Sequence, residues 1–202
     1  MLDEIERVLA GCPQDRAGVR LHGVIGLLEL LATDTAIGRI AATHLGTVAQ
    51  PVRAVLFDKT PGANWTLGWH QDRTIAVRKR HALPGFGPWS VKAGVQHVEP
   101  PFEVIEAMVT LRIHLDPVPA DNAPLLIAPG SHRLGRLATR DITATVERCG
   151  TAACLAERGD VWSYATPILH ASAASTGYAR RRVLQVDYTA SALTAPLAWL
   201  GV

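Results

Sequence analysis

Short apolar runs from residue 51 onward are the feature that most constrains the fold of this chain. Each run has three to seven residues and is bounded by Gly, Pro, Asn or Asp, a rhythm typical of β-strands joined by turns. The runs are Val52–Asp58, Thr74–Val77, Val109–Leu115, Leu125–Ile127, Asp160–Tyr164 and Arg182–Tyr188. Together they predict an antiparallel β sandwich or barrel.

The first 50 residues have a different pattern. Apolar residues recur at helical spacing at Ile25, Leu28, Leu31 and Ala32. A second short helical pattern over residues 34–46 ends at a glycine. With 202 residues and 48% hydrophobic content, the chain has the size of one domain. We expect one domain with a helical packing segment over 1–50, a β core over 51–190 and a C-terminal tail over 191–202.

Charge and cysteine content narrow the classes of partner and compartment. The 20 Lys and Arg nearly balance the 18 Asp and Glu, which gives no electrostatic reason to expect nucleic acid or a membrane as partner. The three cysteines form no C-x-x-C pair, which favours free thiols in a reducing compartment. The N-terminus is acidic where a signal peptide would be basic, and Glu29 interrupts the longest apolar stretch. We therefore expect a cytoplasmic protein.

The segment Trp69-His70-Gln71-Asp72 places an imidazole and a carboxylate two residues apart. At the end of a strand, the two-residue period directs both side chains to the same face. One more imidazole would complete the facial triad of non-haem iron(II) oxygenases, which leaves coordination positions open for cosubstrate and oxygen. His170 is the best candidate, because 97 residues separate it from Asp72, enough for several strands. We predict His70, Asp72 and His170 as metal ligands and catalytic residues.

A second H-x-D motif, His114-Leu115-Asp116, is the alternative, with His132 or His170 as the third ligand. We rank it lower because Pro117-Val118-Pro119 must end the strand, so that the Asp116 carboxylate turns to solvent or into a turn. Four other histidines lack a carboxylate at ligand spacing, namely His22, His44, His81 and His97.

These motifs, with Ala128-Pro129-Gly130-Ser131-His132 and His170-Ala171-Ser172, resemble the phytanoyl-CoA dioxygenase family in order and spacing. The resemblance covers about residues 51–190 and departs at Ala123, where the family often has glycine. It implies a double-stranded β-helix, the cupin-like jelly roll, that is mainly β with flanking helices. It also implies Fe(II) bound by the predicted triad and 2-oxoglutarate chelating the metal.

The family places an arginine eleven residues after the distal histidine, where it binds the far carboxylate of 2-oxoglutarate, and this position is Arg181. Arg180 and Arg182 make the assignment ambiguous from composition alone. Strand alternation separates two sets of side chains. A mixed-polarity face has Arg181, Val183, Gln185 and Asp187, and a face suited to packing against helices has Arg182, Leu184, Val186 and Tyr188. Both arguments favour Arg181.

The resemblance suggests supporting roles for two further residues. Ser172 lies two residues beyond His170 and is expected to donate a hydrogen bond to the same carboxylate. Gln71 is implied to lie near the cosubstrate, although strict alternation directs it away from the metal. The turn Pro129–His132 is expected to be structural. Three aromatic residues are candidate walls of the substrate pocket, namely Trp65, Phe86 and Trp89, and the basic run Arg78–His81 is either a solvated face or a site that attracts an anionic substrate.

The reaction implied by the resemblance uses O2 to convert 2-oxoglutarate to succinate and to hydroxylate a small-molecule substrate. Because Asp72 is present where related halogenases have a small residue, hydroxylation, desaturation or cyclisation is favoured over halogenation. Two alternatives stay open: a cupin-like metalloenzyme that does not use 2-oxoglutarate, and a non-catalytic jelly-roll binding protein. The sequence leaves the substrate and the oligomeric state undetermined.

Overall fold

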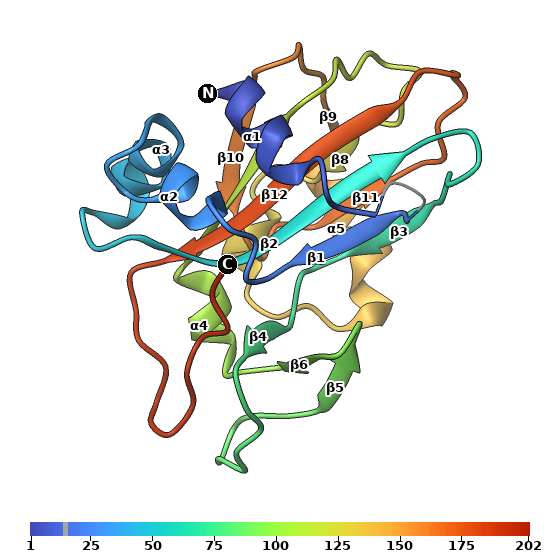
Figure 1. Ribbon diagram of the computed structural model, residues 1–202. Helices are drawn as coiled ribbons and strands as arrows, with labels where there is room; N and C mark the ends of the chain where they lie inside the picture. The colour runs from blue at the N-terminus through green and yellow to red at the C-terminus, as the bar shows by residue number, and fades with distance from the viewer. Residues whose placement is uncertain (14–15) are drawn as a thin grey trace.

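The computed structural model describes residues 1–13 and 16–202 (Figure 1). The helices of this part are α1 (Leu2–Leu9), α2 (Leu27–Leu31), α3 (Ala36–Leu45), α4 (Phe102–Glu106), α5 (Ile142–Cys149) and the 3-10 helices η1 (Ser131–Leu134) and η2 (Thr139–Asp141). The strands are β1 (Gly18–Leu21), β2 (Gln50–Lys59), β3 (Leu67–His70), β4 (Ile75–Val77), β5 (Trp89–Lys92), β6 (Val95–Val98), β7 (Met108–His114), β8 (Leu125–Ile127), β9 (Ala152–Cys154), β10 (Val161–Ala165), β11 (His170–Ser172) and β12 (Arg181–Thr189).

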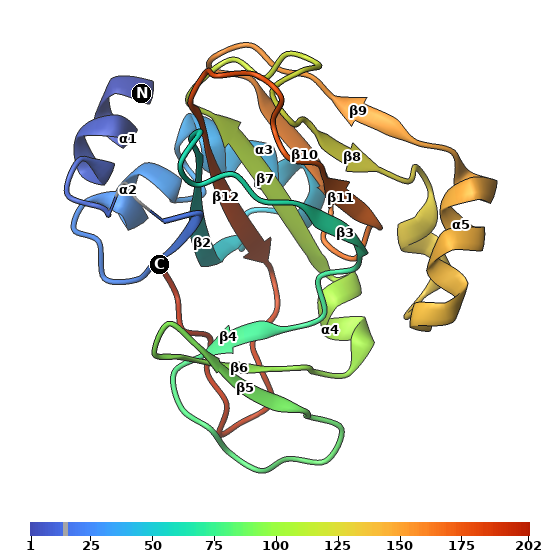
Figure 2. The same cartoon turned by 90° about the vertical axis from the view of Figure 1, so that its right-hand side faces the viewer.

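Two antiparallel sheets form the jelly roll. The larger sheet has the order β1-β2-β12-β7-β10, and the smaller sheet has the order β3-β11-β8-β9. Figure 2 shows the smaller sheet beside the larger one, with a third sheet, β4-β6-β5, below them. Strand neighbours are far apart in the chain, since β12 pairs with β2 on one side and with β7 on the other. The predicted jelly roll with flanking helices is confirmed.

The outer face of the larger sheet is apolar and is covered by the N-terminal helices (Figure 1). Side chains alternate across a strand, and Leu184, Val186 and Tyr188 of β12 are fully buried in one cluster with residues of α1, α2 and α3. The Tyr188 hydroxyl donates to the carbonyl of Leu31 at 2.9 Å, which satisfies its polar atom. The predicted packing face of β12 is therefore confirmed.

Helix α3 shows how local sequence sets an element. The Thr35 hydroxyl accepts the Gly38 N–H at 3.1 Å and caps the first turn. The helix is capped at its C-terminal end by Gly46, whose φ of 79° suits glycine.

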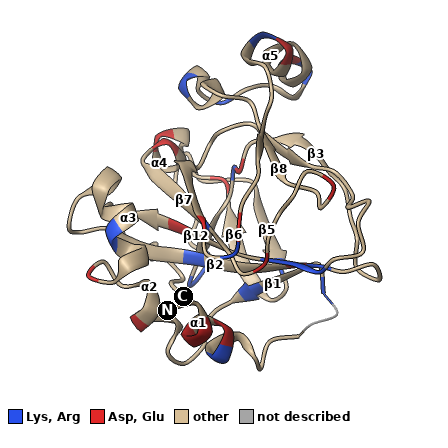
Figure 3. Cartoon of the chain, turned by 90° about the horizontal axis from the view of Figure 1, so that it is seen from above, with Lys and Arg blue, Asp and Glu red and all other residues tan. Residues whose placement is uncertain are grey.

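Charges of both signs are interspersed on helices such as α1 and α5 (Figure 3).

A second apolar cluster holds the third sheet against α4 and the C-terminal segment. Residues 191–202 are not a free tail, because Leu197 and Trp199 are buried there with Val77 of β4. The Leu200 N–H donates to the carbonyl of Ala76 at 3.1 Å. The C-terminal segment therefore stabilises the third sheet, β4-β6-β5.

Residues 1–50 are not wholly helical, which corrects the prediction for this segment. Gly18–Leu21 forms β1, which pairs with β2 at the edge of the larger sheet. With four residues, β1 is too short to leave a clear periodic signal beside longer helical patterns.

The predicted free thiols are confirmed at Cys12, Cys149 and Cys154. Across residues 1–13 and 16–202, no helix has the length and apolar character needed to cross a membrane.

Candidate metal centre

Two short strands of the smaller sheet bring the predicted ligands together. Strand β3 ends at His70, β11 begins at His170, and these two residues lie directly opposite each other in the antiparallel pair. Their ring centroids are 4.3 Å apart. Asp72 follows β3, and the ligand atoms of all three residues lie within 4.8 Å of one another. Within the described ranges, these three residues are the group of His, Cys, Asp or Glu side chains whose ligand atoms lie close enough together to hold a metal ion.

Backbone carbonyls set the tautomer of both imidazoles. His70 Nδ1 lies 2.8 Å from the carbonyl oxygen of Gly68, and His170 Nδ1 lies 2.9 Å from that of Ile168. Because a carbonyl only accepts, each Nδ1 carries a hydrogen, and Nε2 is the ring nitrogen left to bind a metal. Burial lowers the pKa of His170 to about 4, so that this imidazole is neutral at physiological pH. His170 thus has the form that binds a metal.

The Asp72 carboxylate is held from behind by Arg53 of β2. The distance from Arg53 Nη2 to Asp72 Oδ2 is 3.1 Å, and Arg53 Nε lies 2.6 Å from Oδ2 of the buried Asp187. Asp187 also accepts a hydrogen bond from the Thr110 hydroxyl at 2.9 Å. Burial raises the pKa of Asp72, but Arg53 and His170 outweigh it and lower that pKa to about 2. The carboxylate is therefore ionised and oriented.

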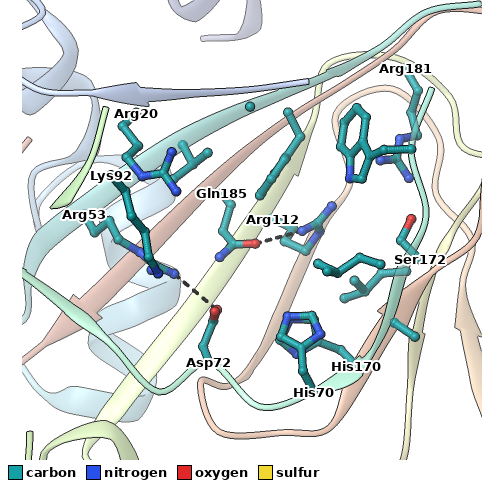
Figure 4. A pocket seen from close by; sticks show the side chains of 17 residues that line it. Arg20, Arg53, His70, Asp72, Lys92, Arg112, His170, Ser172, Arg181 and Gln185 are labelled. Carbon is teal, nitrogen blue, oxygen red and sulfur yellow. Dashed lines mark hydrogen bonds and ion pairs between the residues drawn. The ribbon is translucent and has the colours of Figure 1, made fainter. Parts of the chain in front are cut away.

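A cavity of about 220 Å³ lies between the two sheets of the jelly roll (Figure 4). The metal group lines one side of it, and its apolar lining includes Val55, Phe57, Trp65 and Leu67. Five basic side chains also line it: Arg20, Arg53, Lys92, Arg112 and Arg181. The cavity therefore combines a candidate metal site with an excess of positive charge.

Arg181 is a buried cation without a counterion. Its side chain is 2% exposed, Nη1 donates to the carbonyl of Ala123, and Nε has no hydrogen-bond partner. No carboxylate of residues 1–13 and 16–202 forms an ion pair with Arg181, whereas Arg180 pairs with Asp58 and Arg182 pairs with Asp116. Burial, followed by the nearby Arg112, lowers the pKa of Arg181 to about 9. A bound anion would offset the cost of burying this charge.

A family model decides how these features are interpreted. The model described as phytanoyl-CoA dioxygenase (PhyH) matches residues 28–183, which is most of the chain. The chain belongs to the phytanoyl-CoA dioxygenase family. The resemblance predicted from the motifs is thereby confirmed. A search of curated proteins finds no match.

Solved structures show the fold of this phytanoyl-CoA dioxygenase family member in other proteins. EctD from S. alaskensis, described with 2-oxoglutarate and 5-hydroxyectoine, has a TM-score of 0.66 and 18% identity, over 92% of this chain and 60% of EctD. HygX from Streptomyces hygroscopicus, described with nickel and 2-oxoglutarate, has a TM-score of 0.59 and 13% identity, over 93% of this chain and 75% of HygX. AviO1 from Streptomyces viridochromogenes Tue57 has a TM-score of 0.54 and 21% identity, over 84% of this chain and 66% of AviO1. The chain thus spans less than two thirds of EctD and AviO1.

Ser172 lines the cavity of this family member, on the strand that starts at His170. Lys59 Nζ donates to the Ser172 hydroxyl oxygen at 3.1 Å and also to the carbonyl of Ala173. The Ser172 hydroxyl in turn donates to the carbonyl of Ala173 at 3.4 Å, a long hydrogen bond that a stronger acceptor in the cavity would replace. The placement is compatible with the predicted hydrogen bond to an anion beside Arg181.

Gln71 does not line the cavity, and its amide is engaged elsewhere. Nε2 donates to the carbonyls of Gly135 at 3.0 Å and Pro167 at 2.9 Å, and Oε1 accepts the Leu137 N–H at 2.9 Å. The side chain thus points away from the cavity, as strict strand alternation requires, and its predicted place beside the cosubstrate gains no support from the geometry. Gln71 ties the segment between η1 and α5 to the turn before His170.

The second H-x-D motif is structural. His114 is buried, with Nδ1 3.2 Å from the carbonyl oxygen of Asp160. Of the two predicted directions for Asp116, solvent or a turn, the structure shows the second: the residue lies in a bend after β7, and its carboxylate accepts hydrogen bonds from the backbone N–H and the guanidinium of Arg182. The predicted structural role of the Pro129–His132 turn fits the buried Ser131, which accepts the N–H of Leu169 beside the metal group at 2.9 Å.

Only one of the three predicted aromatic walls lines the cavity. Trp65 does so, whereas Phe86 and Trp89 pack in the second apolar cluster around β4 and α4. They do not line the cavity, because Trp89 begins β5 of the third sheet and Phe86 lies in the segment just before it. The basic run Arg78–His81 is also absent from the cavity lining, and Arg80 lies over the Trp89 ring at 5.4 Å.

Sequence reasoning missed the basic residues on the inner face of the larger sheet. In β2, Arg53, Val55 and Phe57 line the cavity, while Ala54 and Leu56 pack with the helices. The same alternation in β7 directs Arg112 into the cavity. The available signal was a charged residue inside an otherwise apolar strand, on the face opposite to the packing residues, as at Arg53 in β2 and Arg112 in β7.

Proposed function

We propose that this chain is a non-haem Fe(II)- and 2-oxoglutarate-dependent dioxygenase that forms succinate and hydroxylates a small molecule. The observation that carries the proposal is the meeting, in one cavity, of the His70, Asp72 and His170 ligand atoms with the uncompensated Arg181. Similar folds described with iron, or with nickel and 2-oxoglutarate, support it.

The donor set fits Fe(II). Two imidazole Nε2 atoms and one carboxylate make the two-histidine, one-carboxylate arrangement that leaves open positions on the metal. When bound, Fe(II) with 2-oxoglutarate and O2 supplies the oxidation chemistry that side chains lack. The protein's own residues position these groups and exclude water.

Arg181 and Ser172 would bind the far carboxylate of 2-oxoglutarate. A guanidinium offers two parallel donors to a carboxylate, and the Ser172 hydroxyl would add a third by turning from the carbonyl of Ala173. Phe57, Val55 and Leu125 surround this part of the cavity with apolar groups that keep water out and strengthen the ion pair. A metalloenzyme that made no use of 2-oxoglutarate would leave Arg181 buried without a counterion, which argues against that alternative.

The cavity favours a small substrate. Its volume of about 220 Å³ lies below the range of roughly 300–1,000 Å³ that is common for ligand pockets. Hydroxylation is the reaction that the intact triad supports, since Asp72 occupies the third protein position on the metal.

Anaerobic titration tests the proposal. Protein with Fe(II) should develop a weak visible metal-to-ligand band when 2-oxoglutarate is added, and should release succinate when O2 is admitted. Arg181→Gln should weaken 2-oxoglutarate binding by about 10- to 100-fold, since a hydrogen-bonded charge pair is lost, while metal affinity stays close to wild type. Arg140→Gln, at an exposed arginine, is the matched control.

The two H-x-D motifs provide a further control. Asp72→Ala should abolish succinate release, whereas Asp116→Ala should leave iron binding nearly unchanged. The absence of any 2-oxoglutarate-dependent band in folded wild-type protein would overturn the proposal, and the reverse behaviour of the two aspartates would move the metal site to the other motif.

A further inference from the structure

A second basic end of the cavity lies away from Arg181. Arg20 of β1 and Lys92 of β5 lie together with Arg53 at one end, and Arg181 and Ser172 lie at the other (Figure 4). Arg20 projects inward because β1 alternates, so that its neighbours Val19 and Leu21 pack with the helices instead. Two separate sheets therefore contribute cations to the same place.

The charges of Arg20 and Lys92 are not compensated by protein groups. Arg53 is neutralised by Asp72 and Asp187, but neither Arg20 nor Lys92 has an ion pair with any carboxylate of the described chain. Lys92 Nζ donates only to the Thr74 hydroxyl, at 3.2 Å. Burial, followed by the neighbouring Arg53, lowers the pKa of both groups.

The charge balance of the whole site stays positive after the proposed cofactors are bound. Five basic side chains line the cavity, and two carboxylates, Asp72 and Asp187, oppose them. A divalent metal adds two positive charges and 2-oxoglutarate adds two negative ones. Three positive charges then have no counterpart, and two of them belong to the Arg20 and Lys92 end. Arg20 is exposed and Lys92 is half-buried, so this end of the cavity is open to solvent, and its unpaired positive charges attract anions.

We propose that the substrate is a small anion whose carboxylate or phosphate group binds Arg20 and Lys92. The Arg20 guanidinium presents a flat pair of donors and the Lys92 ammonium adds a point charge, a combination suited to an oxyanion. Because 2-oxoglutarate is assigned to the Arg181 end, the two anions do not compete, and the metal ligands lie between them (Figure 4). This inference rests on the proposed function.

Matched pairs of charged and neutral probes test the inference. Wild-type protein is loaded anaerobically with Fe(II) and saturating 2-oxoglutarate, so that the Arg181 end is filled. Pentanoate is compared with pentanamide, and butyl phosphate with pentanol, and binding is followed by the broadening of probe proton signals near the paramagnetic iron. At least one acid should bind about tenfold or more tightly than its neutral partner, as expected for a hydrogen-bonded charge pair. The carboxylate and phosphate arms identify which acid group the site takes.

Variants assign that preference to the two residues. Arg20→Gln and Lys92→Gln should each weaken acid binding by about tenfold, and the double variant should bind acid and neutral probe alike. Arg140→Gln and Lys79→Gln, at exposed positions outside the cavity, should keep the preference. The 2-oxoglutarate titration of the visible band should keep its midpoint in all of them.

The outcomes separate this inference from the proposed function. Equal binding of acids and neutral probes in wild-type protein, or an acid preference that survives in the double variant, overturns the inference while the 2-oxoglutarate band stays. Loss of the band in wild-type protein overturns the proposed function instead. A preference lost in Arg181→Gln but kept in the double variant would place the substrate anion at the other end and would also overturn the inference.

Discussion

At the scale of single residues, the candidate metal centre depends on side chains that touch its ligands from behind. His70 and His170 each direct Nδ1 to the carbonyl two residues earlier in the chain, so the strand backbone itself selects the tautomer. Arg53 links the Asp72 and Asp187 carboxylates and so controls the charge of the ligand. Removing a partner of this kind commonly lowers metal affinity by about 10- to 100-fold.

Replacing Arg53 tests this link. Arg53→Gln should lower Fe(II) affinity by about 10- to 100-fold, because Asp72 loses its orienting partner. It should also destabilise the fold, since the buried Asp187 is left without a counterion. The double variant Arg53→Gln/Asp187→Asn removes that charge and should recover stability but not affinity. Unchanged Fe(II) affinity in the folded double variant would contradict the role of Arg53.

His114 predicts a pH dependence of stability. Burial lowers its folded pKa to about 4, whereas the unfolded value is about 6.5. Between these values the unfolded chain binds a proton that the folded protein does not, so the free energy of unfolding falls as the pH drops from about 6.5 towards 4. His114→Gln should remove on the order of 2 kcal/mol of the loss between pH 7 and pH 5.

Urea unfolding at the two pH values measures the His114 effect. Gln50→Ala, at an exposed residue that does not titrate, should leave the pH dependence of the wild-type protein unchanged. An identical pH slope in His114→Gln and wild-type protein would mean that His114 titrates alike in both states. Iron binding should be retained in this variant, since the His114 motif is not the metal site.

At the scale of elements, each strand of the larger sheet serves two surfaces. One side of β2, β7 and β12 packs with the helices, and the other side presents charged residues to the cavity. The smaller sheet supplies the metal ligands from β3 and β11, and η1 and α5 cover it. Gln71 joins these parts through three hydrogen bonds to backbone atoms.

Removing the Gln71 amide should loosen that junction. Gln71→Ala leaves buried backbone groups without partners, so the free energy of unfolding should fall by about 1–3 kcal/mol. Hydrogen exchange of the Leu137 amide should accelerate, because Gln71 Oε1 is its acceptor. Gln50→Ala, at an exposed glutamine, is the control. Unaltered exchange at Leu137 would show that another group holds this segment.

At the scale of the whole molecule, the cavity exists only where the two sheets meet. The metal would connect β3, the turn after it and β11, and the proposed anions would lie against the larger sheet. A ligand that binds the folded protein, and not the unfolded chain, stabilises it by mass action. Stability should therefore depend on metal and 2-oxoglutarate concentration.

Thermal unfolding measures this coupling. Fe(II) at a hundred times its dissociation constant should stabilise the folded protein by about 2.7 kcal/mol and raise Tm, and a chelator should reverse the shift. Asp72→Ala should lose most of the effect, whereas Asp116→Ala should retain the metal-dependent shift even if its Tm without metal is lower. A metal-induced shift of equal size in Asp72→Ala would place the ion elsewhere.

Much of the fold could be predicted from sequence where a strand is long and alternates clearly. The predicted runs in β2, β7 and β12 correspond to long strands of the larger sheet. The strands β1, β5, β6, β9 and β11 have three or four residues and were missed, and β3 was expected only from its H-x-D motif. The equally short β4 and β8 were found because they are apolar runs bounded by turn residues. A segment this short does not hold its conformation by itself, because its backbone hydrogen bonds come from strands far away in the chain.

The sequence by itself determined which side chains share a face and which residues have ligand chemistry. The spacing of His70 and Asp72 and the alternation around Arg181 are local properties, because the two-residue period of a strand follows from backbone geometry. The family match is also carried by residues that the sequence alone displays.

Only the tertiary structure decided which of these groups meet. It placed His170 opposite His70, gave Arg180 and Arg182 carboxylate partners that Arg181 lacks, and brought Arg20 and Lys92 together from different sheets. Pairing register and burial depend on contacts between segments far apart in the chain, which local periodicity does not encode. The metal ligands predicted from spacing thus lie in a charged cavity whose existence depends on how the two sheets pack.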